Sequence, residues 1–239
     1  MKRILFGLLF FIASLPLHAQ MQAVDLGLSV DWGTCNLGAS QPQESGDFYS
    51  WGEARPKTSF TEENYKLYKP GPGQQSSNPW DLPWLFVKYC TDKPYGPQKI
   101  PYGTVDNKLV LEAVDDAATA TLGSKWRMPT AAERNELLQQ CRWEWTQVGG
   151  VYGYEVTSKK NGNSIFLPVT GYYYHEYRMH KTDLGYYWTA SLDKEYPYGA
   201  QALSFSSDIL YPNPDSAYEL SYWARRFYFG FAIRPVKIK

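Results

Sequence analysis

The sequence has few of the residues on which metal sites, disulfide frameworks and nucleic-acid surfaces depend. Its 239 residues include three cysteines and three histidines, so at most one intrachain disulfide can form and a histidine-rich metal site has few ligands available. Lys plus Arg and Asp plus Glu are equal, at 24 each. Without a basic excess there is no electrostatic reason to expect nucleic acid as a partner. We therefore predict no metal, no cofactor and no nucleic acid.

Long hydrophobic runs are also scarce, and the one that exists lies at the start. Lys2 and Arg3 precede the apolar run Ile4–Leu17, which a small residue follows at Ala19. The run is too short to span a bilayer, and the pattern is typical of a secretory signal peptide. We predict a signal peptide at 1–19, an exported mature chain and no transmembrane segment. No cysteine lies at the cleavage point, which disfavours a lipid anchor.

The cysteines at positions 35, 90 and 141 leave two interpretations open. In an oxidising compartment two of them could pair and leave one thiol. Alternatively, Cys35, Cys90 and Cys141 are all small buried apolar residues. We favour the second interpretation.

Two helices are indicated in the middle of the chain. Thr130 with Glu133 three residues later forms a capping box, and this predicts a helix over about Ala131–Cys141. Leu137, Leu138 and Cys141 give it one apolar face. Asp115-Asp116 and Gly123 bound a shorter helix at Ala117–Leu122, with acidic residues at its start and glycine at its end.

The rest of the chain indicates strands and long loops, hence one α+β domain over residues 20–239. Alternating apolar residues and turn signals place the strands. We predict a strand or a strand pair within Ala23–Asn36, broken at Gly27, and strands at Trp143–Gln147, Gly153–Ser158, Ser164–Val169, Tyr186–Ser191, Gln201–Ser206 and Phe229–Val236. Residues 54–104, Gly171–Asp183 and Ser207–Tyr228 are predicted to be irregular.

Several motifs in a fixed order resemble a known family. They include VDLGLSVDWGTCNLGAS, GDFYSWGEARPK, KWRMPTAAERNELL, NGNSIFLPVTGY and GFAIRPV, between Ala23 and Val236. In this order they are similar to the secreted Fibrobacter succinogenes major paralogous domain family of Bacteroides-type bacteria, and WRMPTAAE and GFAIRPV are distantly similar to formylglycine-generating enzymes. The resemblance implies a C-type lectin-like fold with paired terminal strands, two flanking helices and long loops, and export by a Gram-negative cell. A Pro-rich insertion at about 70–101 departs from the family pattern.

In this fold the segment before the last strand displays the binding face, and here it spans Asp208–Phe227. Tyr and Trp give large contact area at low rotamer cost, while Arg and Asn add directed hydrogen bonds. We predict that it binds a glycan or a cell-surface protein. The candidate residues are Tyr211, Asn213, Asp215, Tyr218, Glu219, Tyr222, Trp223 and Arg225, joined by Tyr173, Tyr174 and His175.

Other aromatic residues are assigned to packing. Trp188 alternates within a predicted strand, and Trp32, Trp126 and Trp143 belong with it in the core. Calcium-dependent sugar binding would need clustered oxygen ligands, and Pro212–Asp215 is only a partial approach to such a cluster. A calcium site is therefore not predicted.

An enzyme is the less favoured interpretation. The formylglycine-generating enzymes use a reactive cysteine pair near the C-terminal end, and this chain has no cysteine after Cys141. Ser191 or Ser206 with His175 or His180 lacks any hydrolase motif. The remaining alternative is a structural or adhesive component of a cell-envelope assembly.

Overall fold

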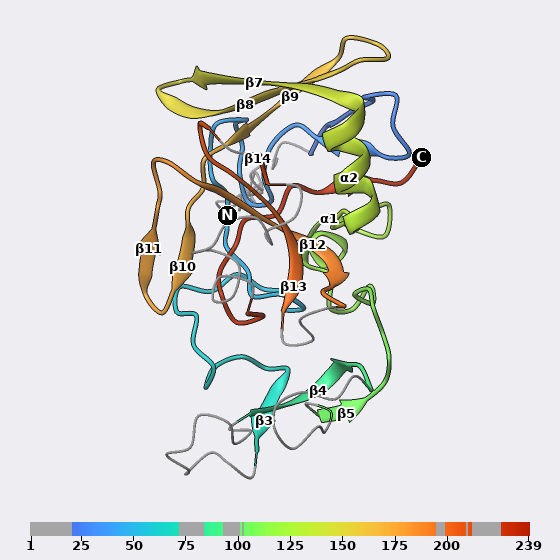
Figure 1. The fold of residues 1–239 in the computed structure, drawn as a ribbon, viewed down its shortest axis with the longest axis vertical. Coiled ribbons are helices and arrows are strands. Elements are labelled where there is room, and N and C mark those ends of the chain that lie inside the picture. The colour runs from blue at the N-terminus through green and yellow to red at the C-terminus, as the bar shows by residue number, and fades with distance from the viewer. Residues whose placement is uncertain are drawn as a thin grey trace, which may run out of the picture.

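The structure is a computed structural model, and it describes residues 21–71, 84–92, 101, 103–194, 199–208, 210–211 and 226–239. The predicted signal peptide at 1–19 lies outside the described residues. Within the described ranges, no helix has the length and apolar character needed to cross a membrane. The α+β class is confirmed, because this part of the chain combines two helices with mostly antiparallel sheets (Figure 1).

A four-stranded antiparallel sheet joins the two ends of the described chain. Its order is β1 (Ala23–Val24), β2 (Asp31–Gly33), β15 (Val236–Lys237) and β6 (Trp126–Arg127). The predicted N-terminal strand pair is confirmed. The connection between β1 and β2 contains Gly27, whose φ of 70° favours a residue without a Cβ atom.

The last predicted strand, Phe229–Val236, is shorter than expected, since regular pairing begins only at Val236. The segment before it changes partner from residue to residue. Its isolated bridges join Gly230 to Tyr173, Phe231 to Tyr49 and Ala232 to Tyr187. A segment that passes between three elements cannot form one continuous ladder, which is why the alternating pattern overestimated the strand.

The short helix α1 (Ala117–Leu122) has the predicted bounds. The Asp116 carboxylate caps it by accepting a hydrogen bond from the Thr119 backbone N–H at 2.9 Å, and Gly123 ends it with a φ of 89°. Asp115 has a different role from its neighbour. Its carboxylate accepts hydrogen bonds from Lys88 and from the Tyr89 hydroxyl.

The helix α2 (Ala131–Gln140) begins at the predicted capping box. The Thr130 side chain accepts from the Glu133 N–H at 3.3 Å, and the Glu133 carboxylate accepts from the Thr130 N–H at 2.7 Å. Leu137 is buried as expected. Arg134 is also buried, and its guanidinium donates to the carbonyl of Ala202 at 2.8 Å.

Most predicted strands after α2 are confirmed, in two antiparallel sheets of three strands each. The first consists of β7 (Cys141–Val148), β8 (Val151–Ser158) and β9 (Ser164–Pro168). The second consists of β12 (Gly185–Leu192), β13 (Ala200–Phe205) and β14 (Leu210–Tyr211). β14 was not predicted, since it lies within the segment Ser207–Tyr228 that was expected to be irregular.

The region at 171–183, predicted to be a loop, contains a β-hairpin instead. Its strands are β10 (Tyr172–Tyr174) and β11 (Tyr177–Met179), joined through His175 and Glu176. The prediction was wrong because the polar residues suggested a loop. The tyrosines, which favour strands, lie on either side of a two-residue turn.

Residues 54–104 were predicted to be irregular, and this too is wrong in part. They contain the sheet β3 (Tyr68–Pro70), β4 (Trp84–Cys90) and β5 (Gly103–Val105). Within the predicted insertion at 70–101, the Phe86 ring packs on Phe227 with ring centres 5.1 Å apart. Phe86, in the described part of the insertion, therefore packs against the body.

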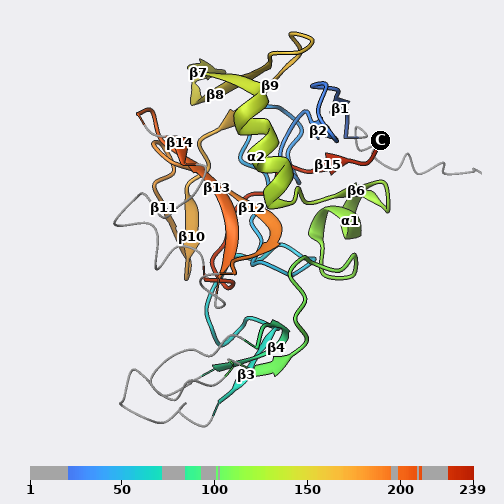
Figure 2. The same cartoon turned by 45° about the vertical axis from the view of Figure 1, so that its right-hand side comes forward.

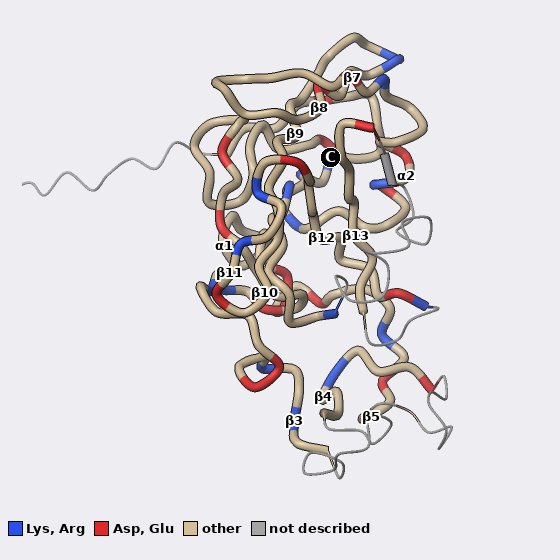
Figure 3. The backbone as a smooth tube through the Cα atoms, turned by 60° about the vertical axis from the view of Figure 1, so that its left-hand side comes forward, with Lys and Arg blue, Asp and Glu red and all other residues tan. Residues whose placement is uncertain are grey.

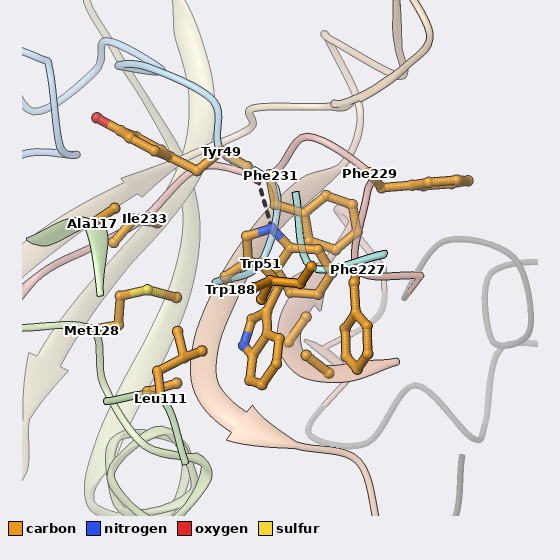
Figure 4. Packing of buried hydrophobic residues seen from close by; sticks show 14 of the residues in the cluster. Tyr49, Trp51, Leu111, Ala117, Met128, Trp188, Phe227, Phe229, Phe231 and Ile233 are labelled. Atoms are coloured by element: carbon orange, nitrogen blue, oxygen red, sulfur yellow. Dashed lines mark hydrogen bonds between the residues drawn. The ribbon is translucent and has the colours of Figure 1, made fainter. Parts of the chain in front are cut away.

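The core contains the predicted tryptophans. Trp188 is fully buried, stacks on Phe231 with ring centres 4.0 Å apart, and donates its indole N–H to the Tyr49 carbonyl at 2.8 Å (Figure 4). Trp32 and Trp126 are buried as well, while Trp143 is half-buried against the core.

All three cysteines are buried and none of them forms a disulfide, so the interpretation of Cys35, Cys90 and Cys141 as small core residues is confirmed. Burial raises the pKa of the Cys141 thiol to about 11. Because the thiolate is the reactive form, this thiol is a weak nucleophile at neutral pH.

Replacing Glu133 by glutamine should flatten the pH dependence of stability. Burial alone would raise the pKa of Glu133, but hydrogen bonds from Arg127 and Thr130 hold it below the usual carboxyl value. A lowered pKa contributes stability above the unfolded-state pKa, and that stability is lost as the pH falls through the folded-state value. We expect the variant to lose about 1 kcal/mol at pH 7 and much less at pH 3.

Urea unfolding at the two pH values measures this effect. Asp92→Asn, which removes an exposed carboxylate after β4, is the control. Equal losses for Glu133→Gln at pH 7 and pH 3 would show that the charge of Glu133 is not what stabilises the helix start.

Candidate functional site

The hairpin β10–β11 lies on the side of the molecule away from α1 and α2 (Figure 1 and Figure 2). Its register pairs Tyr172 with Met179, Tyr173 with Arg178 and Tyr174 with Tyr177. Directly opposite residues share a face of a sheet. Tyr173 and Arg178 therefore form one face, and the other two pairs form the opposite face.

The face with Tyr173 and Arg178 packs on the body. The Tyr173 ring lies 4.8 Å from the Phe48 ring and 5.4 Å from the Phe60 ring. The Arg178 guanidinium lies 4.9 Å from the centre of the Phe48 ring and donates to the Thr170 carbonyl at 2.9 Å. Tyr173 was a predicted binding residue, but its contacts make it an anchor of the hairpin.

The opposite face, which we call the hairpin face, consists of Tyr172, Tyr174, Tyr177 and Met179. Tyr172 is half-buried and stacks parallel to Phe229, with ring centres 5.9 Å apart. The exposed fractions of the other three are 41% for Tyr174, 69% for Tyr177 and 41% for Met179. Together they expose a patch of aromatic and thioether surface.

The hairpin is tied to the body on more than one side. The Tyr173 backbone exchanges hydrogen bonds of 2.8 and 2.9 Å with Gly230, and His175 exchanges bonds of 3.0 and 3.1 Å with Phe60. His175 has a φ of 55°, in the left-handed region that most residues avoid. Its backbone conformation is thus held by these partners, and such held positions are concentrated at functional sites.

The hairpin face meets the end of the predicted binding loop. The Tyr174 ring lies 5.0 Å from the Phe229 ring and 6.5 Å from the Tyr228 ring. Arg226, which precedes them, donates to Glu62 at 3.0 Å. Burial raises the pKa of Tyr228 well above its usual value, so this hydroxyl stays neutral. Tyr228 and Phe229, which follow the predicted binding segment, are therefore held beside Tyr174.

Most predicted residues of the loop itself lie outside the described residues. These are Asn213, Asp215, Tyr218, Glu219, Tyr222, Trp223 and Arg225. For Tyr211 the structure describes only the backbone, which pairs with Ser204 as part of β14. Of the predicted site residues with described side chains, Tyr174 lies on the hairpin face, His175 lies at its tip and Tyr173 packs beneath it.

No family model matches the chain, no curated protein is similar to it in sequence, and no solved structure matches its fold. The family resemblance and the C-type lectin-like fold therefore stay predictions.

Tyr177 and Met179 belong to the hairpin face but were not predicted. The signal was present, because Tyr172, Tyr174, Tyr177 and Met179 are related by strand alternation about a two-residue turn. Treating residues 171–183 as a loop concealed it.

Within the described residues, no group of three His, Cys, Asp or Glu side chains gathers. The Ser191 hydroxyl accepts from the Ala131 N–H at 3.0 Å at the start of α2, and His180 pairs with Asp183 at 3.2 Å. Positive and negative residues occur at both ends of the molecule (Figure 3).

The hairpin face itself presents aromatic rings and a thioether, which can contact a ligand.

Proposed function

We propose that this protein is an exported, non-catalytic binding module of the cell surface, with a C-type lectin-like fold. Its binding face combines the hairpin face with the predicted binding segment Asp208–Phe227, and its ligand is a glycan or a protein. The proposal needs no cofactor. The alternative is a structural or adhesive role in a cell-envelope assembly, which would use the same face for a different partner.

The observation that carries the proposal is the exposure of Tyr174, Tyr177 and Met179 on a hairpin that is fixed to the core. Exposed rings on a rigid support bind at low entropic cost, because each has few rotamers to lose. Ring faces stack on sugar rings and also pack against apolar protein surface. The contact of Tyr174 with Tyr228 and Phe229 supports extending the face to the preceding loop.

The fold supports the proposal in a second way. The resemblance implies that strands from the two ends pair, that two helices flank them and that a long segment before the last strand carries the ligand. β2 pairs with β15, α1 and α2 lie in the middle of the chain on either side of β6, and residues 212–225 come shortly before β15 in the chain.

Replacing both Tyr174 and Tyr177 by alanine should weaken ligand binding without unfolding the protein. Two exposed rings lost from the centre of a contact should cost about 2 kcal/mol or more of binding free energy. The melting temperature should move by only a few degrees, since these rings are largely outside the core. A glycan array and a pull-down from envelope extracts find the ligand, and they also separate the glycan-binding role from the envelope-assembly role.

The matched control is Tyr152→Ala on β8, because Tyr152 is another exposed tyrosine, with 49% of its surface accessible. It should leave binding unchanged. Unchanged binding by the double variant would refute the role of the hairpin face, and a large loss of melting temperature would show that these rings are structural.

A further inference from the structure

A cavity of about 350 Å³ lies between the β7–β8–β9 sheet and the N-terminal strands. This is within the size range of small-molecule sites. Val24, Thr34 and Pro42 form one wall, and Thr146, Glu155 and Phe166 belong to the other. None of these residues belongs to the hairpin face, so a role for this cavity is independent of the proposed function.

The sheet register sets two carboxylates and a ring side by side, and of these Glu155 and Phe166 line the cavity. Glu155 on β8 lies directly opposite Glu144 on β7 and opposite Phe166 on β9. Directly opposite residues share a face, so the three side chains leave the sheet on the same side. Because side chains alternate along a strand, the two neighbours of Glu155, Tyr154 and Val156, point to the other side of the sheet, into the core.

Neither carboxylate forms an ion pair with another described residue. The Ser164 hydroxyl donates to the Glu155 carboxylate at 3.0 Å and holds it in place. Among the ion pairs formed within the described residues, none includes Glu144 or Glu155. Like charges directly opposite each other destabilise an antiparallel pair. Such an unfavourable pair of like charges in the otherwise regular β7–β8 hairpin is typical of a functional position.

We propose that this cavity binds a small organic cation. The ammonium group lies beside the Glu155 carboxylate and within the field of Glu144, and its apolar chain lies against Val24 and Phe166. The ring of Phe166 adds a favourable face for a cation. A divalent metal fits less well, because calcium needs six or more oxygen ligands and no third acidic residue joins this pair within the described chain.

Three six-carbon probes of equal length test the proposal by NMR on the purified exported protein at pH 7. They are n-hexylammonium chloride, 1-hexanol and sodium hexanoate. Hexylammonium should shift the backbone amides of Thr146, Glu155 and Ser164 and reach saturation. Hexanol should bind at least about tenfold more weakly, and hexanoate should not bind.

Charge-neutral variants then assign the cation site. Glu155→Gln keeps an acceptor for Ser164 and should lower the affinity for hexylammonium about tenfold, to the level of hexanol. Glu144→Gln, which is beside the cavity, should lower it about threefold. Asp92→Asn, which removes one negative charge from the loop after β4, should have no effect.

Equal binding of hexanol and hexylammonium would overturn the proposal, and so would unchanged affinity in Glu155→Gln. Shifts that never saturate and follow exposed carboxylates in general would also overturn it, since they would mean non-specific ion pairing. If Glu155→Gln fails to fold, the comparison of the three probes on the unmodified protein still decides.

Discussion

Replacing Arg234 by methionine is expected to lower the free energy of unfolding by about 3 to 5 kcal/mol. Arg234 precedes the last strand and is buried. Its guanidinium donates three hydrogen bonds: to the Asn36 side-chain oxygen at 2.8 Å, to the Gly33 carbonyl at 3.0 Å and to the Phe166 carbonyl at 2.8 Å. One side chain thus links β2, the following loop and β9 to the C-terminal segment.

The size of the effect reflects the three acceptors that methionine leaves unpaired. Methionine fills much of the same volume, but it donates no hydrogen bond to the three oxygens. Bonds from a charged donor are worth more than neutral ones, and losing one partner of a buried bond costs more than losing both. Removing the charge recovers part of this loss, because burial disfavours the charged guanidinium and lowers the pKa of Arg234.

Urea unfolding followed by tryptophan fluorescence measures the change. Arg142→Met, on the exposed side of β7, is the matched control and should change stability by less than about 0.5 kcal/mol. A stability for Arg234→Met equal to that of the unmodified protein would mean that burying the charge costs as much as its three bonds contribute.

Replacing Trp188 by alanine should also cost about 3 to 5 kcal/mol. Trp188 lies at the centre of the larger core cluster, where it stacks on Phe231 and donates its indole N–H to the Tyr49 carbonyl. Alanine would leave a cavity beside Phe231, and the Tyr49 carbonyl would lose the indole donor and keep only the Phe231 backbone N–H. The cavity would lie beside Phe231, two residues after Phe229, whose ring contacts Tyr174 on the hairpin face.

Thermal and urea unfolding of Trp188→Ala and Trp188→Phe separate the two losses. Phenylalanine keeps most of the stacking but not the N–H donor, so its loss should be smaller, about 1 to 3 kcal/mol. A matched control is Trp145→Ala, because Trp145 is half-buried and stacks on the exposed Tyr152. If Trp188→Ala and Trp145→Ala lost equal stability, the central place of Trp188 in the core would be refuted.

Features that depend on neighbouring residues could be predicted from the sequence. The capping box of Thr130 and Glu133, the α1 cap at Asp116 and the strands around Gly149-Gly150 follow from local hydrogen bonds and turns. Their prediction needed no information about distant parts of the chain.

Features that depend on distant partners could not be predicted in the same way. The positive charge of Arg234 suggests a surface residue, and only its three acceptors on other elements make burial possible. β5 is short and pairs in parallel with β4. Its first residue, Gly103, lies so close to β4 that a Cβ atom there would be 2.1 Å from the Phe86 carbonyl oxygen. No local pattern reveals such a contact.

The candidate site was predicted in part for the same reason. The aromatic residues of two segments, Tyr173–His175 and Asp208–Phe227, suggested one binding face. Tyr174 does contact Tyr228 and Phe229, which follow the second segment. The run Tyr172–Tyr174 alone does not say which ring is buried. The pairing with β11 places Tyr177 and Met179 on the face opposite Tyr173. The contacts of Tyr173 with Phe48 and Phe60 show that its face is the one that packs on the body.

Hydroxyl-radical footprinting with the ligand from the array or pull-down gives the sharpest test of the hairpin face. Oxidation of Tyr174, Tyr177 and Met179 should fall at least about threefold on saturation, as expected for side chains buried in a contact, while Tyr152 stays unchanged. Unchanged oxidation of these three side chains with a saturating ligand would mean that the protein binds through another surface.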